Sequence, residues 1–309
     1  MRILLFGKNG QVGWELERVL PALGTVVGLD FHEVDFARPE NLRAVVRAQH
    51  PDLIVNAAAY TAVDQAESEP AKAMAVNGIA PGILAEEAAA LGAGLVHYST
   101  DYVFDGTKLA PYTEEDPAAP LNVYGRTKLE GDRAVAGAGA AYLILRTSWV
   151  YGARGRNFTQ TIRRLARERT ELRIVDDQVG NPTWCRSIAE ATAQMLSGIT
   201  NAGGAGFFAE MDRCKGVYNF SSEGEVSWFD FARAILESDP GRSQHRVREI
   251  LPIKTAEYPT AARRPLFSVL SKEKIRRVFG ISAASWRDQF AGCMQALGPI
   301  HEGHEGDEE

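Results

Sequence analysis

The chain opens with MRILLFGKNGQVGWELERVL (residues 1–20), in which an apolar run meets three glycines and then a segment with helical spacing. Gly7, Gly10 and Gly13 recur at every third position. Positions without a Cβ allow a tight turn after a strand, close approach of the backbone to a pyrophosphate, and close packing of the helix on the strand. The free N–H groups at the helix N-terminus favour an anion there. A tight turn without a ligand is the alternative, since the spacing is G-x-x-G-x-x-G and not G-x-G-x-x-G.

The alternation of apolar and amphipathic segments continues to about residue 148. Apolar runs at 2–7, 25–30, 52–59, 94–99 and 141–148 alternate with helical patterns at 11–20, 39–50, 80–92 and 124–135. Unbroken apolar strands joined by amphipathic helices predict a parallel sheet covered on both faces. We therefore expect a Rossmann-type doubly wound α/β domain over residues 1–148. The pattern over residues 149–299 predicts a smaller mixed α/β lobe, with some elements returning to the sheet. The acidic segment 300–309 predicts a disordered tail.

Composition excludes several classes of protein. The 309 residues carry a net charge of -6, which argues against a broad nucleic-acid-binding surface. No apolar run approaches the roughly 20 residues of a membrane span, and the apolar start is too short for a signal peptide. Cys185, Cys214 and Cys293 are odd in number and far apart, so we expect buried free thiols and neither disulfides nor a zinc cluster. The prediction is a cytoplasmic protein that binds neither nucleic acid nor membrane.

Two further features lie at predicted strand ends. Asp30 ends the second strand, where a carboxylate can accept hydrogen bonds from both hydroxyls of an adenosine ribose. Residues 57–59 are alanines, which leave room for a flat ligand at the carboxyl edge of the sheet. A strand, a glycine turn and a helix, followed by a second strand that ends in an acidic residue, together predict that the chain binds a nicotinamide dinucleotide. The carboxylate favours NADH, while the nearby His32 and Arg38 leave NADPH open.

A tyrosine and a lysine share one face of the helix predicted at 124–135. Tyr124 and Lys128 stand at i and i+4, where a lysine ammonium would lower the pKa of the phenol and make it a usable proton donor or acceptor. Thr100 ends the fourth strand at the edge that also carries the glycines, so its hydroxyl could polarise the same carbonyl group. A surface pair on a helix is the alternative for Tyr124 and Lys128 alone.

Six stretches carry a family resemblance over residues 1 to about 297. They are LLFGKNGQVGWEL, VNAAAYTAVDQAESEP, VHYSTDYVFDG, PLNVYGRTKLEGD, LRTSWVYG and YPTAARRP. The chain resembles the extended short-chain dehydrogenase/reductases, and within them most closely the dTDP-4-dehydrorhamnose reductases. The resemblance implies reduction of the C4 keto group of dTDP-4-dehydro-β-L-rhamnose to dTDP-L-rhamnose by NADPH or NADH.

The resemblance also implies roles for individual residues. Tyr124 would donate the proton, Lys128 would bind the nicotinamide ribose, and Thr100 would hold the keto oxygen. Asp101 and Trp149 would contact the sugar, although Trp149 also suits the core at a strand end. The residues expected at the cofactor, besides Tyr124 and Lys128, are Gly7, Gly10, Gln11, Val12, Gly13, Asp30, Asp35, Phe36, Ala57, Ala58, Ala59 and Tyr98. The nucleotide diphosphate needs cationic donors, for which Arg263 or Arg264 is the candidate.

One departure from the family concerns metal. Some members dimerise through a magnesium ion held by glutamates, and Glu15 matches one of these, but Arg186 and Arg287 stand where other carboxylates are expected. We therefore predict no structural metal and a monomer or weak homodimer.

Two other functions fit parts of the pattern. A nucleotide-sugar epimerase or dehydratase of the same superfamily would keep NAD bound without net redox change. A non-catalytic subunit, similar to the regulatory subunit of methionine adenosyltransferase, would act by binding a partner. The presence of Thr100, Tyr124 and Lys128 favours the reductase over both.

Overall fold

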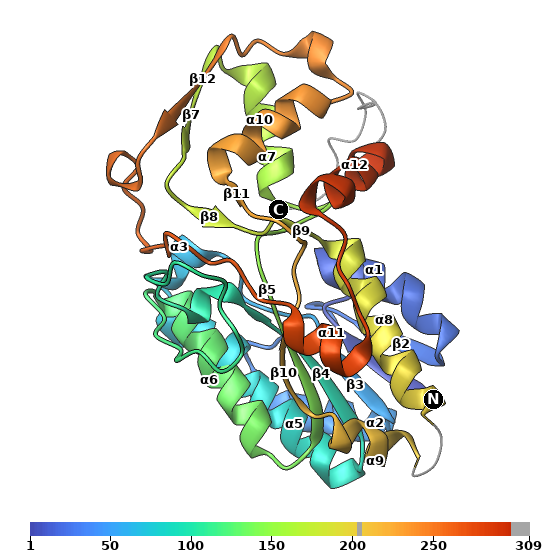
Figure 1. Cartoon of the computed structure of the whole chain (residues 1–309). Helices are drawn as coiled ribbons and strands as arrows, with labels where there is room; N and C mark the ends of the chain where they lie inside the picture. The colour runs from blue at the N-terminus through green and yellow to red at the C-terminus, as the bar shows by residue number, and fades with distance from the viewer. Residues whose placement is uncertain (203–205, 298–309) are drawn as a thin grey trace.

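Side chains of strand β1 (Arg2–Phe6) alternate between two apolar cores. Ile3 and Leu5 belong to one core, and Leu4 and Phe6 to the other. A strand buried on both faces requires a covering layer on each side of its sheet. The computed structural model, which describes residues 1–202 and 206–297, has these layers: a parallel sheet lies between two groups of helices (Figure 1).

The sheet has six parallel strands in the order β10-β5-β4-β3-β1-β2. The other five strands are β2 (Thr25–Leu29), β3 (Leu53–Asn56), β4 (Gly94–Thr100), β5 (Ala141–Thr147) and β10 (Gly216–Asn219). The direction of winding reverses between β1 and β3, and a doubly wound sheet binds its ligand at the carboxyl ends of the strands at such a point. The predicted Rossmann-type fold is confirmed, and β10 is an element that returns from beyond residue 148.

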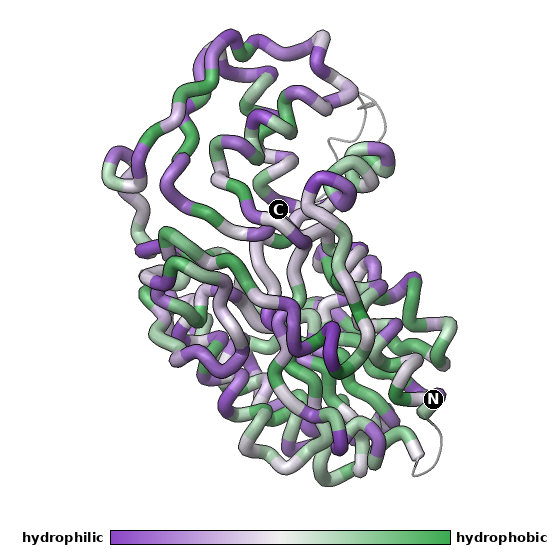
Figure 2. The backbone as a smooth tube through the Cα atoms, viewed as in Figure 1, coloured by the Kyte–Doolittle hydropathy of each residue, from purple (hydrophilic) through white to green (hydrophobic). Residues whose placement is uncertain are grey.

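Helices cover the two faces as the alternation requires. One face carries α2 (Leu42–Gln49), α5 (Ala80–Leu91) and α6 (Val123–Gly137), whose apolar side chains share a core with Leu4 and Phe6. The other carries α1 (Gln11–Val19), α8 (Cys185–Asn201), α9 (Phe207–Arg213) and α11 (Glu273–Phe279). Figure 2 shows the hydrophobic strands enclosed by helices whose outer faces are more hydrophilic. The catalytic candidates on α6 are therefore held against a rigid sheet.

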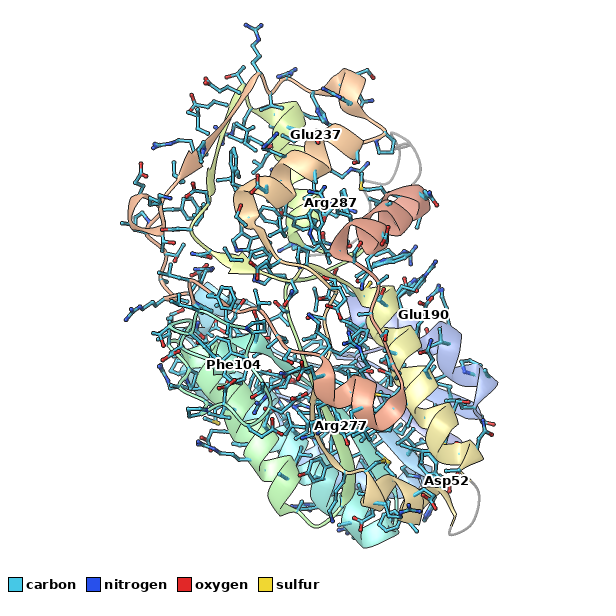
Figure 3. All side chains as sticks on the ribbon, in the orientation of Figure 1. Asp52, Phe104, Glu190, Glu237, Arg277 and Arg287 are labelled. Atoms are coloured by element: carbon cyan, nitrogen blue, oxygen red, sulfur yellow. The ribbon has the colours of Figure 1, made fainter. Side chains whose placement is uncertain are left out.

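A smaller lobe lies beyond the carboxyl edge of the sheet (Figure 1). Its helices are α7 (Phe158–Glu168), α10 (Trp228–Ser238) and α12 (Trp286–Leu297). Its strands pair as β7 (Glu171–Val175) with β12 (Glu249–Ile253), β6 (Val150–Tyr151) with β9 (Thr183–Trp184), and β8 (Val179–Gly180) with β11 (Val226–Ser227). Aromatic side chains, Phe231 and Phe290 among them, form its separate core. In Figure 3, Glu237 and Arg287 belong to this lobe and Phe104 to the larger one.

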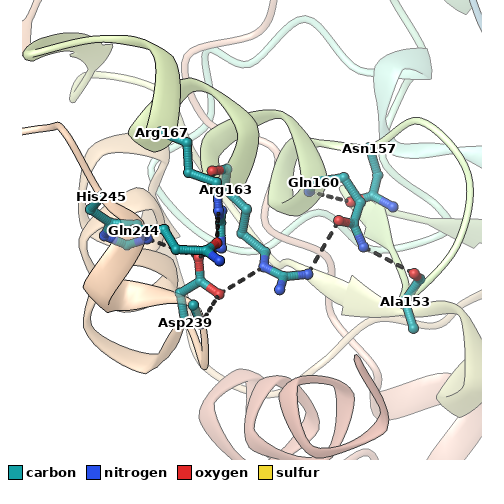
Figure 4. A network of polar contacts seen from close by, with 9 residues as sticks. Ala153, Asn157, Gln160, Arg163, Arg167, Asp239, Gln244 and His245 are labelled. Atoms are coloured by element: carbon teal, nitrogen blue, oxygen red, sulfur yellow. Dashed lines mark hydrogen bonds and ion pairs between the residues drawn. The ribbon is translucent and has the colours of Figure 1, made fainter. Parts of the chain in front are cut away.

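A buried charged cluster ties α7 to the end of α10 in the smaller lobe (Figure 4). The Asp239 carboxylate, whose side chain is 0 % exposed, accepts from Arg163 Nε at 3.0 Å and from Arg167 Nη2 at 2.9 Å. His245 Nε2 lies 2.8 Å from the same carboxylate. We refer to these four residues as the Asp239 cluster.

Several local features differ from the predictions. The helix expected at 80–92 is preceded by α3 (Val63–Ala66), α4 (Pro70–Met74) and a π-helical stretch, η3 (Ala75–Ile79), that runs directly into α5. Strand β3 ends at Asn56, so the three alanines lie in the loop after it. Cys185 and Cys293 are buried free thiols as expected, whereas Cys214 is partly exposed. The tail predicted at 300–309 lies outside the described residues.

Short 3-10 turns complete the chain: η1 (Leu20–Ala22), η2 (Pro39–Asn41), η4 (Asp101–Val103), η5 (Arg242–Gln244) and η6 (Thr255–Glu257). Within residues 1–202 and 206–297, no helix has the length and apolar character needed to cross a bilayer.

Candidate active site

The three N-terminal glycines form a tight turn between β1 and α1. Gly7 has a φ of +78°, and a Cβ there would lie 2.7 Å from the backbone nitrogen of Ala58. A Cβ on Gly13 would lie 1.9 Å from the carbonyl oxygen of Gly7, so this glycine allows the helix to pack on the strand end. Gly10 is the N-cap of α1, and no side chain caps the helix. The first N–H groups of α1 are therefore available to an anionic ligand.

A cavity of about 660 Å³ lies at the carboxyl edge of the sheet, beside this turn. It brings together nearly all of the residues predicted to contact the cofactor. Those that line it are Gly7, Gly10, Gln11, Val12, Asp30, Asp35, Phe36, Ala57, Ala58, Ala59, Tyr98, Tyr124 and Lys128. Gly13 is the exception, because its contact is with Gly7. The cavity thus joins the glycine turn to the Tyr124 and Lys128 pair.

Asp30 has a local structural task in addition to its place in the cavity. One of its carboxylate oxygens accepts from the backbone N–H of Asn9 at 2.7 Å, and the other accepts from Phe31 N–H at 2.7 Å. The carboxylate therefore ties the glycine turn to the end of β2. These two N–H groups offset part of its negative charge, which weakens the argument from Asp30 for NADH over NADPH.

Tyr124 lies in the second residue position of α6, where Asn122 caps the helix by accepting from Gly125 N–H at 2.8 Å. Burial raises the pKa of Tyr124 to about 12, and the Thr100 side chain, which hydrogen bonds to the phenol, offsets only part of this increase. The expectation that Lys128 lowers this pKa is wrong for this structure. The reason is that the phenol is partly removed from water, while Lys128 Nζ donates to the Tyr98 carbonyl oxygen. A phenol with this pKa stays protonated near neutral pH.

Lys128 is buried and faces strand β4. Its Nζ donates to the carbonyl oxygen of Tyr98 at 2.5 Å and lies 3.4 Å from His97 Nε2. Burial lowers the pKa of Lys128 to about 8, although the nearby Asp132 carboxylate opposes this shift. The charge of this lysine is therefore sensitive to its neighbours within the ordinary working range of pH.

Thr100 and Asp101 form a second buried group beside Tyr124. The Thr100 hydroxyl donates to Asp101 Oδ1 at 3.0 Å and accepts from Tyr102 N–H at 3.1 Å. Ser148 Oγ donates to Asp101 Oδ2 at 3.0 Å. Burial raises the pKa of Asp101 to about 6, because hydroxyl groups compensate its charge only in part. Asp101 thus orients Thr100, the candidate ligand of the keto oxygen.

The residues predicted in the second half of the chain to bind substrate differ in how free their side chains are to contact a ligand. Trp149 has a positive φ of 46° and stacks on Trp228 with 3.4 Å between ring centroids. Arg264 makes a two-pronged ion pair with Asp64, at 2.6 Å and 3.1 Å, which leaves its guanidinium less free for a diphosphate. Arg263 is exposed, and its backbone oxygen accepts from Asn122 Nδ2 at 2.7 Å. The segment 262–264 is therefore anchored next to the start of α6.

Sequence reasoning missed several residues of this site. Arg156 is an exposed arginine of the smaller lobe that nevertheless lines the cavity. Asn77, in the π-helical stretch, accepts from Tyr60 N–H at 2.9 Å and donates to Tyr60 O at 3.0 Å, which fixes the loop after β3. Asn56 and His97 lie behind Lys128. Only Arg156 had a visible signal, a cation in a glycine-rich turn before a helix cap; the others depend on contacts between distant segments.

The glutamate that matches the magnesium-binding members is paired with a cation. Arg186 Nε lies 3.3 Å from Glu15 Oε2. Across the part of the chain that the structure describes, no group of three or more metal-ligating side chains is found.

A doubly wound parallel sheet, an uncapped glycine-rich helix start and a Tyr-x-x-x-Lys helix opening on one cavity define an oxidoreductase of the extended short-chain dehydrogenase/reductase type. Comparison with known proteins narrows this class. The family model described as "RmlD substrate binding domain" matches residues 1–298. The chain belongs to this family, the dTDP-4-dehydrorhamnose reductases.

Individual relatives agree over nearly the full length. A dTDP-4-dehydrorhamnose reductase of Burkholderia thailandensis is 51% identical and covers 96% of this chain and 99% of its own. A crystal structure of the Clostridium acetobutylicum reductase matches with a TM-score of 0.86 at 33% identity, covering 96% of this chain and 99% of that one. The Bacillus anthracis reductase, solved in complex with NADP, matches with a TM-score of 0.82 at 33% identity and the same coverage.

Proposed function

We propose that this chain reduces the C4 keto group of dTDP-4-dehydro-β-L-rhamnose to dTDP-L-rhamnose, with NADPH or NADH as the reductant. The observation that carries the proposal is a cavity that joins an uncapped helix start to a partly buried, protonated Tyr124. The relatives named above as dTDP-4-dehydrorhamnose reductases support the choice of substrate.

The cavity fits a nicotinamide dinucleotide. Gln11 and Val12 would present their N–H groups to the pyrophosphate, and Asp30, Asp35 and Phe36 line the end suited to the adenosine. The bound cofactor supplies a hydride to the sugar C4. The alanines at 57–59 keep the opposite wall close and flat, where a larger side chain would reduce the space.

The chain's own residues handle the proton. Tyr124 holds a proton on its phenol near neutral pH and would donate it to the oxygen at C4, as a general acid must. Thr100 would hold the same oxygen once its single hydroxyl hydrogen, which is donated to Asp101 at 3.0 Å in this structure, turns to the substrate. Lys128 would bind the nicotinamide ribose. Because Thr100, Asp101 and Lys128 are buried, water competes little for their polar groups.

We also propose a division of labour between the lobes. Residues 1–148 would bind the cofactor, and residues 149–299 would supply most contacts to the nucleotide sugar. Trp149 would contact the sugar with the part of its indole that Trp228 and Gly180 leave uncovered. The exposed Arg263 is the better candidate for the diphosphate, because Arg264 already pairs with Asp64. A monomer or weak homodimer without magnesium remains the predicted assembly, supported by the contact of Glu15 with Arg186. A cytoplasmic location stays a prediction.

The test is an assay of purified protein with dTDP-4-dehydrorhamnose and either reduced cofactor. Loss of the near-ultraviolet absorbance of NADPH or NADH, dependent on substrate and accompanied by dTDP-L-rhamnose, is the expected result. Rearranged sugar without net cofactor oxidation would indicate an epimerase or dehydratase instead. Cofactor binding with no turnover of this or related nucleotide sugars would contradict the proposal and favour a non-catalytic subunit.

A further inference from the structure

A chain of three buried polar side chains runs behind the cavity. Asn56 ends β3, His97 lies on β4 and Lys128 lies on α6; their exposed fractions are 1%, 0% and 2%. Asn56 Nδ2 lies 3.1 Å from His97 Nδ1, and His97 Nε2 lies 3.4 Å from Lys128 Nζ. The imidazole thus connects an amide on one side to the lysine on the other.

The orientation of the Asn56 amide is set by its backbone neighbour. Ala58 N–H donates to Asn56 Oδ1 at 3.2 Å, and a reversed amide would place an NH2 group against that N–H. The Asn56 NH2 group therefore points at His97 Nδ1, which must accept with its lone pair. A neutral imidazole carries a single hydrogen, so in His97 this hydrogen is on Nε2 and faces Lys128. Burial keeps the ring neutral, because it lowers the pKa of His97 well below its ordinary value.

This tautomer has a consequence for the lysine. An N–H group directed at Nζ opposes an ammonium ion there and favours the neutral amine, whose lone pair can accept the hydrogen. The Tyr98 carbonyl oxygen, 2.5 Å from Nζ, accepts a hydrogen from either form.

Two other ionisable groups lie around Lys128. Asp132, on the same helix, favours the ammonium, but its carboxylate pairs with Arg146 of β5 at 3.1 Å. Tyr124 lies one turn earlier on the helix and is protonated near neutral pH. His97 is therefore the neighbour whose hydrogen position can change the equilibrium between the ammonium and the neutral amine of Lys128.

We propose that Asn56, by fixing the tautomer of His97, sets the charge state of Lys128. Asn56 and His97 are positioning residues: they act through the lysine and touch neither of the groups assigned to the keto oxygen. The inference rests on the proposed function only in that Lys128 serves the cofactor and Tyr124; the hydrogen positions themselves are independent of turnover.

The first experiment measures the tautomer directly. The ¹⁵N NMR signals of the histidine rings are recorded at neutral pH, and those of His97 are assigned by their loss in His97→Phe. The expected result is an unprotonated Nδ1 and a protonated Nε2. A hydrogen on Nδ1 of His97 would overturn the proposal, whatever the enzyme assay shows.

The second experiment reverses the tautomer. In Asn56→Asp a carboxylate oxygen still accepts from Ala58 N–H, but His97 Nδ1 now faces an acceptor and must carry the hydrogen. Its Nε2 then accepts from the Lys128 ammonium, so the alkaline limb of kcat/KM, expected near pH 8 in the parent enzyme, should move up by roughly one pH unit. The same variant should switch the ¹⁵N pattern of His97.

A matched control separates the tautomer from the added charge. Asn56→Asp is repeated in the His97→Phe background, where no imidazole connects the two groups, and there the shift should largely disappear. An equal shift in both backgrounds would mean that the carboxylate acts through space, and the proposal would fail. If the protein has no reductase activity, ¹⁵N-lysine titration of Lys128 in the same variants replaces the rate profile, so failure of the proposed function and failure of this inference are told apart.

Discussion

Asp101 and Asp239 are both buried carboxylates, but they lie in different lobes and their pKa values move in opposite directions. Burial raises the pKa of Asp101 to about 6, because its partners are hydroxyl groups. Burial also favours the neutral form of Asp239, but hydrogen bonds from His245 and Gly241 and the charges of two arginines outweigh it and lower the pKa. The kind of partner, and not depth alone, decides the charge of a buried group.

This difference distinguishes a site suited to catalysis from a cluster that stabilises the fold. Near the cavity, Tyr124, Lys128 and Asp101 are incompletely compensated, so their proton affinities depart from ordinary values. In the smaller lobe, the Asp239 cluster matches a carboxylate with cations (Figure 4). We expect substitutions in the first region to change activity more than stability, and the reverse in the second.

The largest effect is expected for Tyr124→Phe. The variant keeps the ring but lacks the acidic proton, so turnover should fall by roughly 10²- to 10⁴-fold, as is typical of a lost general acid. Cofactor affinity and the free energy of unfolding should change little. Steady-state kinetics, cofactor titration and urea unfolding measure the three quantities. Near-normal turnover would remove Tyr124 as the proton donor.

Asp239→Asn is expected to act on stability instead. It leaves the Arg163 and Arg167 guanidiniums without their carboxylate, which should cost about 3–5 kcal/mol of the free energy of unfolding. Because the folded-state pKa is lowered, the wild-type advantage is present above the ordinary value of 3.8 and is lost as the pH falls through the folded-state pKa. Urea unfolding between acid and neutral pH measures it.

The matched control for this variant is Glu237→Gln. Glu237 lies in the last turn of α10, two residues before Asp239, but its contact with Arg233 is exposed and 3.8 Å long, so less than about 1 kcal/mol should be lost. An equal loss in both variants would mean that the Asp239 cluster has no special role in holding α7 to α10. Turnover per folded molecule should be retained in each.

Asp101→Asn should change the pH dependence of stability with the opposite sign. The folded-state pKa is raised from 3.8 to about 6, so wild-type stability falls as the pH rises between these values, by about 2–3 kcal/mol, and then levels off. Asparagine does not ionise, so this fall should be absent from the variant. Urea unfolding of both proteins across that pH range provides the test, and parallel curves would show that Asp101 is not the uncompensated group described here.

Much of the fold could be predicted from the sequence because its physical causes are local. The glycine turn and the apolar strands each leave a pattern within a few residues. The π-helical stretch at 75–79 leaves none, since its shape depends on the contact of Asn77 with a loop 17 residues earlier.

The sequence could predict which residues line the cavity, but it could not predict the pKa values of the groups there. Strand ends in a parallel sheet meet at one edge, so Asp30, Thr100 and the alanines could be placed together. The pKa of Tyr124 could not be predicted, because the i, i+4 spacing indicates a shared helix face but not the direction in which Lys128 points. That direction depends on β4, where the Tyr98 carbonyl oxygen accepts a hydrogen from Lys128 Nζ and the His97 ring lies next to it.

Arg156→Gln is the mildest change and tests how far the smaller lobe contributes to cofactor binding. Arg156 lines the cavity from a loop that Asn157 joins to the glycine turn, through a 2.9 Å hydrogen bond to Gln11. Arg154 of the same loop stacks on Trp14 at 3.8 Å. Arg156 is exposed and lines the cavity, so its charge is available to a phosphate bound there. Loss of one charge-assisted contact should raise the Kd for NADPH about tenfold.

The control for Arg156→Gln is Arg164→Gln, which removes the same charge from an exposed pair with Glu168 on α7 and should leave the Kd unchanged. Isothermal titration with NADPH measures both variants. Repeating the titration with adenosine, which lacks the pyrophosphate, should give equal affinity for parent and variant. If Arg156→Gln weakened adenosine as much as NADPH, the arginine would be shaping the loop and not binding phosphate, and cofactor recognition would belong to the larger lobe alone.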